Sequence, residues 1–352
     1  MSDATFAASY QGERASRGGA VWMGAFGLLL LAAMLAGLGL GRLSIPLPTV
    51  AAILFQDIVP VTKDWSVLDE RIVTLVRAPR ILIAALSGAA LAMCGAALQG
   101  IFRNPLVSPQ ILGISSGAAF GGALAILFGY SGFMLVGSAF AFGVLALLSV
   151  GFVARVDGRT ETATIVLAGI IVGALFAALV SLVQFVADPN SSLPAIVGWL
   201  MGSFASATWP RLMLAAPAIA IAAIGLYLLR FRVNVLSLGD DEARSFGVKV
   251  ERDRWIFFIL VALGTGAVVA VAGVVGWVGL VVPHAARLIV GPDHRILVPA
   301  SALLGAAYLV IIDTLARTVS ASEIPLSVLT AIIGAPVFAL LLRRSRRQEN
   351  AR

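Results

Sequence analysis

Long uncharged, apolar stretches alternate with short polar ones along almost the whole chain. Many of them reach the roughly 20 residues that an α-helix needs to cross a bilayer. The long uncharged windows are 21–41, 81–102, 104–154, 162–187, 189–210 and 255–286, and the shorter ones are 212–229, 296–312 and 324–342. This pattern predicts an all-α polytopic membrane protein.

One window leaves the number of spans open, because 193–205 forms either a short span or a surface or re-entrant helix. If this window does not cross and the amino terminus is cytosolic, 18 Lys and Arg residues lie on the cytosolic side and 7 on the outer side. If it does cross, 7 lie on the cytosolic side and 18 on the outer side. The positive-inside rule favours the first arrangement, with both termini cytosolic. Its ten spans lie near 21–41, 74–101, 108–128, 132–154, 162–187, 211–231, 255–275, 277–290, 297–316 and 324–342.

The predicted organisation is a polar cytosolic segment over 1–20, a transmembrane domain over 21–344 and a cytosolic tail over 345–352. Within the domain, the spacing G-x6-G-x9-P occurs once from Gly88 and again from Gly266. The two copies run in opposite directions in the ten-span arrangement, and such inverted repeats are typical of transporters. Coincidence among 36 glycines and plain helix packing are the alternatives.

Composition agrees with a membrane protein, since 60% hydrophobic residues exceed the usual share in soluble domains. The net charge is +7 and basic residues flank the apolar spans, which indicates membrane anchoring rather than nucleic-acid binding. The single cysteine, Cys94, lies in an apolar run and predicts a small core residue. Neither His284 nor His294 has a clustered Cys or carboxylate, so no metal site is expected.

The chain carries no energy source that its sequence reveals. Lys63 and Lys249 are its only lysines, and neither belongs to the nucleotide-binding motif G-x-x-x-x-G-K-[ST]. Asp313 is the only acidic residue in a span, and Arg317 one turn later predicts a locally neutralised pair rather than an ion-coupling site. We therefore expect no catalytic residues and a translocation subunit driven by another protein.

The segment 236–255, LSLGDDEARSFGVKVERDRW, interrupts the apolar pattern with a cluster of charges. Gly239 precedes an acidic first turn, Arg244 follows, and Gly247 marks the helix end. The arrangement predicts two short surface helices that form a rigid knob for docking on another protein. A merely solvated loop is the alternative.

Four stretches, met in this order, resemble the FecCD family of ABC importer permeases, the type II importers for vitamin B12, haem and ferric siderophores. The resemblance covers about residues 70–344. The stretches are RAPRILIAALSGAALAMCGAALQGIFRNPLVSPQILGISSGAA (77–119), LSLGDDEARSFGV (236–248), GVVGWVGLVVPHAARLIVGPDHRILVPASALLGA (273–306) and IPLSVLTAIIGAPVFALLLRR (324–344).

This resemblance implies ten spans per subunit in the type II importer permease fold and a homodimer with the substrate path at its interface. It implies two separate ATPase subunits, which bind ATP and Mg, and a periplasmic substrate-binding protein. The implied location is the bacterial cytoplasmic (inner) membrane. We expect neither a cofactor nor a metal ion in this chain itself.

The resemblance also assigns roles to particular residues. Coupling helices at about 236–250 would sit in a cleft of the ATPase, and they carry Leu238, Gly239, Asp240, Glu242, Arg244 and Gly247. The arginines matching those that meet glutamates of the binding protein are Arg77, Arg80 and Arg317. The cytosolic gate would include Asn104, Leu106, Thr162 and Ala163. The family often has a hydroxyl residue where Ala163 stands, so an apolar constriction is the alternative to a hydrogen-bonded gate.

The substrate is the least determined property. An apolar path with scattered polar groups suits a large, partly apolar ligand held loosely, so an iron complex, haem or a ferric siderophore, is the first expectation. Vitamin B12 is the alternative, and an oxyanion such as molybdate comes after it. The functional alternatives of another class are a secondary transporter or channel and a non-transporting membrane scaffold.

Overall fold

The computed structural model describes the backbone of residues 3–58, 60–154, 162–320 and 322–349, and this described part is helical with no strand. The first helices are α1 (Asp3–Gly39), α2 (Leu47–Phe55), α3 (Val67–Arg71), the π-helix η1 (Ile72–Arg77), α4 (Ala78–Ile101), α5 (Ile114–Leu127), α6 (Gly132–Ala154) and α7 (Thr162–Val186). The remaining ones are α8 (Ser192–Leu200), α9 (Trp209–Leu228), α10 (Arg230–Leu236), α11 (Asp240–Ser245), α12 (Val250–Ala272), α13 (Val278–Val290), α14 (His294–Thr318) and α15 (Leu326–Glu349).

Ten apolar helices in the described part match the ten predicted spans. Seven are long and apolar enough to cross a membrane, and α5, α13 and the apolar part of α15 are three shorter ones. The uncertain window 193–205 contains α8, whose nine residues extend about 14 Å. This is half the hydrocarbon thickness or less, so α8 does not add a span.

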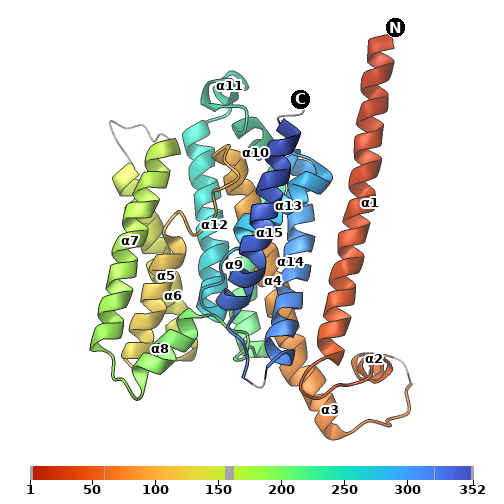
Figure 1. Ribbon diagram of the computed structural model, residues 1–352, viewed down its shortest axis with the longest axis vertical. Coiled ribbons are helices and arrows are strands. Elements are labelled where there is room, and N and C mark those ends of the chain that lie inside the picture. The colour runs from red at the N-terminus through yellow and green to blue at the C-terminus, as the bar shows by residue number, and fades with distance from the viewer. Residues whose placement is uncertain (1–2, 59, 155–161, 321, 350–352) are drawn as a thin grey trace.

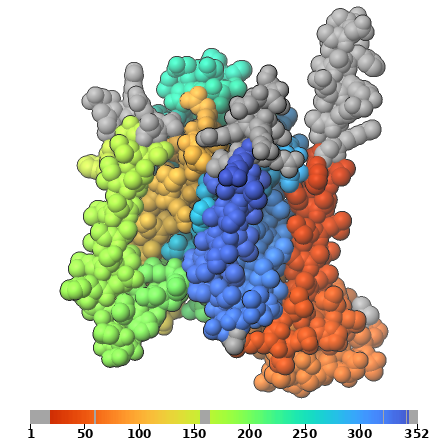
Figure 2. Space-filling model, viewed as in Figure 1, coloured from red at the N-terminus to blue at the C-terminus, as the bar shows by residue number. Residues whose placement is uncertain are grey.

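The short helices gather at the two ends of the bundle. Figure 1 shows α11 at the same end as the start of α1 and the end of α15, whereas α2, α3 and α8 lie at the opposite end. We call these the α11 end and the α3 end. In the space-filling view α11 projects as a knob, and the segment over α2 and α3 forms a shelf beside α1 (Figure 2).

Helix α4 is the most enclosed span and crosses two helices from the last third of the chain. A Cβ added to Gly88 would lie 2.1 Å from the carbonyl oxygen of Gly305 in α14, and one on Gly95 would lie 1.8 Å from that of Gly279 in α13. Only glycine permits such backbone contact, which is how helices pack closely inside a membrane. Cys94, predicted as a core residue, is fully buried beside this crossing.

The two halves have the predicted inverted organisation. Helix α4 runs toward the α11 end and is followed by the non-helical segment 102–113 and the short α5; α12 runs toward the α3 end and is followed by 273–277 and the short α13. The shared glycine spacing is not equivalent in structure, because Gly95 lies inside α4 whereas Gly273 ends α12 with φ 71°.

Span α5 begins six residues later than predicted. The segment before it contains Pro105 and Pro109, which lack the N–H group that a helix needs and disfavour helical geometry in the preceding residue. Gly113, with φ 70°, then forms the N-cap of α5. Because 104–113 carries no charge, the uncharged window concealed this non-helical stretch.

The glycine crossing predicts the effect of added side-chain volume. We expect Gly95→Ala to lower the apparent Tm in detergent by about 5 °C or more, because the new methyl group meets the rigid backbone at Gly279. Gly137→Ala in α6 is the control, since its Cβ would meet nothing within 4 Å. An equal Tm change in both variants would contradict this account of the crossing.

Candidate functional site

The predicted docking knob forms at the tip of the α11 end. Helix α10 is followed by α11, which begins directly after Gly239 with φ 139° and is closed by Gly247 with φ 76°, as the sequence indicated. Leu238 and Phe246 flank α11 with exposed side chains, 55% and 68% accessible. Two exposed apolar side chains on a charged knob are a surface suited to a protein partner.

Ion pairs, each with one buried partner on α12, connect this knob to α12. Arg254 of α12 is 2% exposed and its Nη2 lies 2.8 Å from Oδ1 of Asp240, the first residue of α11. Asp253, equally buried, has its Oδ2 2.6 Å from Nη1 of Arg232 in α10 and its Oδ1 3.0 Å from Nη2 of Arg252. These pairs connect α10 and α11 to the start of α12.

A second set of bonds connects α10 to α14. Asn234 donates through Nδ2 to Oδ1 of Asp293 over 2.7 Å and accepts the backbone N–H of His294 over 2.9 Å. Asp293 also caps α14 by accepting from the backbone N–H of Arg295. Partial burial works to raise the pKa of Asp293, but the hydrogen bonds from Arg295 and Asn234 outweigh it and lower the pKa to about 2.

The two histidines lie in the packed interior. His294 places Nδ1 2.9 Å from the Oδ1 atom of Asn234. His284 packs edge-on against Phe338, with ring centroids 5.6 Å apart. Among the described residues no three His, Cys, Asp or Glu side chains come together as metal ligands do.

The three arginines predicted to meet the binding protein lie together at the α3 end, and all are buried. Arg80 has Nη2 2.8 Å from Oδ1 of Asp313 in α14 and Nη1 2.9 Å from Oε1 of Glu323. Hydrogen bonds from Arg80 lower the pKa of Glu323. Asp313 therefore pairs mainly with Arg80 rather than with Arg317, whose Nε is 3.7 Å away. The local pair expected from the sequence spacing was the weaker one.

Arg77 and Arg317 hold the end of α1. Arg77 donates through Nη1 to the carbonyl oxygens of Leu38 and Gly39, at 2.6 and 3.0 Å. Arg317 donates through Nη1 to that of Leu40 at 2.6 Å. Unpaired carbonyls at a helix carboxyl end attract cations. These arginines therefore act as internal caps, and docking on a binding protein stays a prediction.

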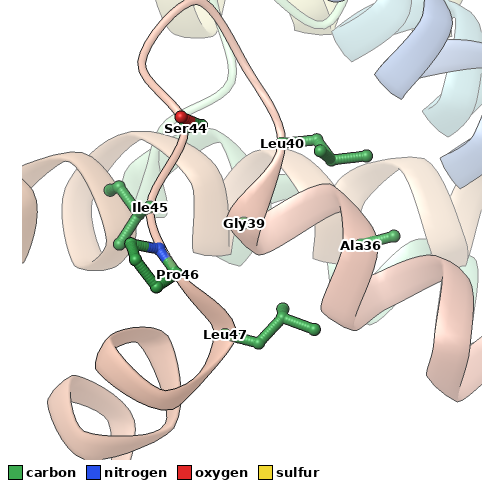
Figure 3. Close-up of a pocket in the computed structure, with 7 residues that line it drawn as sticks. All are labelled: Ala36, Gly39, Leu40, Ser44, Ile45, Pro46 and Leu47. Atoms are coloured by element: carbon green, nitrogen blue, oxygen red, sulfur yellow. The ribbon is translucent and has the colours of Figure 1, made fainter.

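A wide helical turn and two pockets surround the arginines. The π-helical turn Ile72–Arg77 precedes Pro79, which has no N–H for the carbonyl of Leu75. A pocket of about 180 Å³ is lined by the three arginines together with Arg42 and Glu323. A second one, of about 400 Å³, separates α1 from α2, and Figure 3 shows Leu47 opposite the last turn of α1. Its lining is apolar except for Ser44, so it offers little polar recognition.

The predicted gate residues are only partly described. Asn104 and Leu106 lie in the non-helical segment after α4, where Oδ1 of Asn104 accepts the backbone N–H of Leu106 over 2.9 Å. Thr162 and Ala163 form the start of α7, and their side chains lie outside the described residues. A gate formed by these four residues stays a prediction.

Comparison with known proteins identifies the family. The sequence profile of the FecCD transport family matches residues 29–344, from the second half of α1 into α15. The chain belongs to the FecCD transport family. This FecCD chain is therefore an ABC importer permease, a multi-pass membrane protein whose class translocates rather than catalyses.

Similarity to known members extends over most of the chain. The molybdate import system permease MolB of Haemophilus influenzae is 43% identical over 92% of this chain and 96% of its own. The hemin transport system permease HmuU of Yersinia pestis is 41% identical over 78% of this chain and 84% of its own. A solved inward-facing transporter, assigned to the metal-chelate ABC type, has a TM-score of 0.82 at 40% identity and covers 92% of this chain and 98% of its own.

Removing Arg80 tests the buried charge cluster of this FecCD permease. We expect Arg80→Gln to destabilise the protein by roughly 3–5 kcal/mol, because Asp313 is left as a buried carboxylate without its main partner. Arg71→Gln on exposed α3 is the matched control and should change stability by about 0.5 kcal/mol or less. Thermal unfolding in detergent measures both, and equal stability of the two variants would contradict the proposed pairing.

Proposed function

We propose that this chain is the translocation subunit of an ATP-driven importer for an iron complex, haem or a ferric siderophore. It would work as a homodimer in the bacterial inner membrane, with two ATPase subunits that bind ATP and Mg and a periplasmic binding protein that delivers the ligand. The observation that carries the proposal is the exposed knob at α11, fastened to α12 by ion pairs, in a family of ABC importer permeases.

Energy would enter the permease at this knob. When the ATPase subunits close on ATP, they would displace α11, and the pair of Asp240 with Arg254 would carry the displacement to α12. Because α12 leads into the break at 273–277 and α13, its movement would change which side of the path is open. This is alternating access between two halves of inverted organisation.

The α11 end would face the cytosol in this scheme, and both termini with it. The arginine pocket at the α3 end would then face the periplasm and the binding protein. Arg77, Arg80 and Arg317 would contribute through the positive field of the pocket, which steers an acidic partner, while they cap α1 internally.

Molybdate is the second candidate substrate. The molybdate permease MolB matches this chain at 43% identity over nearly the full length of both, whereas the match to the hemin permease HmuU covers 78% of this chain. The identities to the two relatives, 43% and 41%, are nearly equal. Transport measurements can decide.

The transport test uses proteoliposomes that contain the permease, its ATPase subunits and its binding protein. We expect ATP-dependent uptake of haem or of a ferric hydroxamate, and none with a non-hydrolysable ATP analogue. Uptake of molybdate alone would replace the iron complex by the second candidate. Uptake at the full rate without the ATPase subunits would contradict the importer function itself.

Substitutions at the knob test where the ATPase docks. We expect Leu238→Asp and Phe246→Asp each to weaken co-purification of the ATPase by about tenfold or more, since a carboxylate replaces an apolar contact. Phe128→Asp is the control, because Phe128 is 66% exposed and lies between α5 and α6, away from α11. Normal ATPase binding by both knob variants would place the docking surface elsewhere.

A further inference from the structure

Two helices begin inside the membrane thickness and point toward each other. Helix α5 has 14 residues and α13 has 13, so each extends about 20 Å in a hydrocarbon layer of about 30 Å. The short segment 291–293 joins α13 to α14 at the α11 end, and 128–131 joins α5 to α6 at the other end. Both amino termini therefore reach the middle of the bundle, from opposite sides.

A small pocket lies where these two termini meet. It is bounded by Ser108 and Gln110 of the break before α5, Ser115 in the first turn of α5, and Trp277 and Gly279 at the start of α13. Leu91, at the middle of α4, forms its wall. Its volume of about 10 Å³ has room for one water-sized group.

Two serine side chains line this pocket. Ser108 and Ser115 are each only 7% exposed, and neither side chain has a hydrogen-bond partner among the described residues. Ser149 of α6, by contrast, donates to the carbonyl of Leu145 in its own helix. Polar groups without partners are costly at membrane depth, and two serine side chains at one pocket could donate to an oxygen that enters it.

The electrostatics of the pocket favour an anion. Neither α5 nor α13 has a side chain capping its amino terminus, so the positive ends of both helix dipoles remain available. No carboxylate lines the pocket. Half-helix amino termini at the midplane bind the anionic groups of substrates in other transporters.

Trp277 keeps the break in place. It is one of two non-glycine residues with positive φ in the described part, at 67°, a conformation that costs energy and clusters at functional sites. A Cβ added to Gly334 of α15 would lie 3.0 Å from the Cβ of Trp277, so α15 packs directly on this residue. The strained turn thereby positions the first turn of α13 against the pocket.

We propose that this pocket is a transient contact point for an anionic oxygen of the transported ligand. The hydroxyls of Ser108 and Ser115 and the two helix amino termini would donate to it as the ligand passes. The oxygen would belong to a free oxyanion such as molybdate or to a carboxylate of a chelate such as haem. This inference rests on the proposed import function and adds the chemical group that the path recognises.

The first test compares uptake by the complete importer in proteoliposomes, with molybdate and haem as probes. We expect Ser108→Ala with Ser115→Ala to lower the uptake rate per assembled complex by about tenfold, since two hydrogen bonds to an anion are lost. Ser149→Ala is the matched control and should retain the wild-type rate. Uptake by the double variant within about twofold of wild type would overturn the pocket and leave the import function standing.

The second test does not require a transported probe. Ser115→Cys is made in the Cys94→Ala background, and the purified complex is treated with anionic and cationic methanethiosulfonates with and without ATP analogue. We expect the anionic reagent to be favoured by about fivefold, after each rate is divided by that with a free thiol. A cationic preference, or no reaction in either state, would overturn the proposal.

Protection of that cysteine distinguishes the two sources of the oxygen. Slower modification with millimolar molybdate alone assigns the pocket to a free oxyanion, and slower modification with haem alone assigns it to a carboxylate. Protection by neither probe would overturn the contact with an anionic oxygen. A permease that binds its ATPase normally while failing this test keeps the importer function and loses only the pocket.

Discussion

Direct backbone contact between α4 and the pair α13 and α14 is the interaction on which the rest of the structure depends. Lipid chains are as apolar as the helices, so association relies on close packing rather than on exclusion of water. Glycines at 88 and 95 of α4 meet glycines at 305 and 279, and no larger residue fits. Helix α13 is too short to cross the hydrocarbon layer alone, so the non-helical segment before it completes this span. Non-helical backbone at membrane depth must be enclosed by protein. The contact of Gly95 with Gly279 supplies that enclosure.

Charge is concentrated where the two central helices begin. Helix α12 starts with the buried residues Asp253 and Arg254, which hold α10 and α11, and the helix that continues into α4 carries Arg77 and Arg80, which hold α1 and α14. Each helix then runs uncharged across the bundle, and the non-helical segment after it leads to the start of α5 or α13. This arrangement suits a transporter whose two ends receive different partners.

Hydropathy predicted the ten spans because each helix must match the bilayer, and basic residues settled the ambiguous 193–205. Ion pairs between residues far apart in the chain could not be predicted from the sequence. Arg80 and Asp313 are separated by 233 positions, whereas Arg317 is one turn from Asp313 and was therefore predicted as its partner. The late start of α5 was missed because residues 104–113 carry no charge, and the span was predicted from uncharged windows. The sequence did not single out Ser108 and Ser115 either, since only the structure shows that both line one pocket.

A contact inside a transport path has to be weak, because a ligand that binds tightly there does not leave. The pocket meets this requirement by using neutral hydroxyls and helix termini, while the full charges of Arg77, Arg80 and Arg317 remain at the end of the bundle, engaged with carbonyls and carboxylates. An arginine at the break would bind an anion as a fixed ion pair. Because such a site contacts only one oxygen, the rest of the ligand can vary in size and chemistry. A shared scaffold can then serve relatives as different as a molybdate and a hemin permease, with discrimination left to the protein that delivers the cargo.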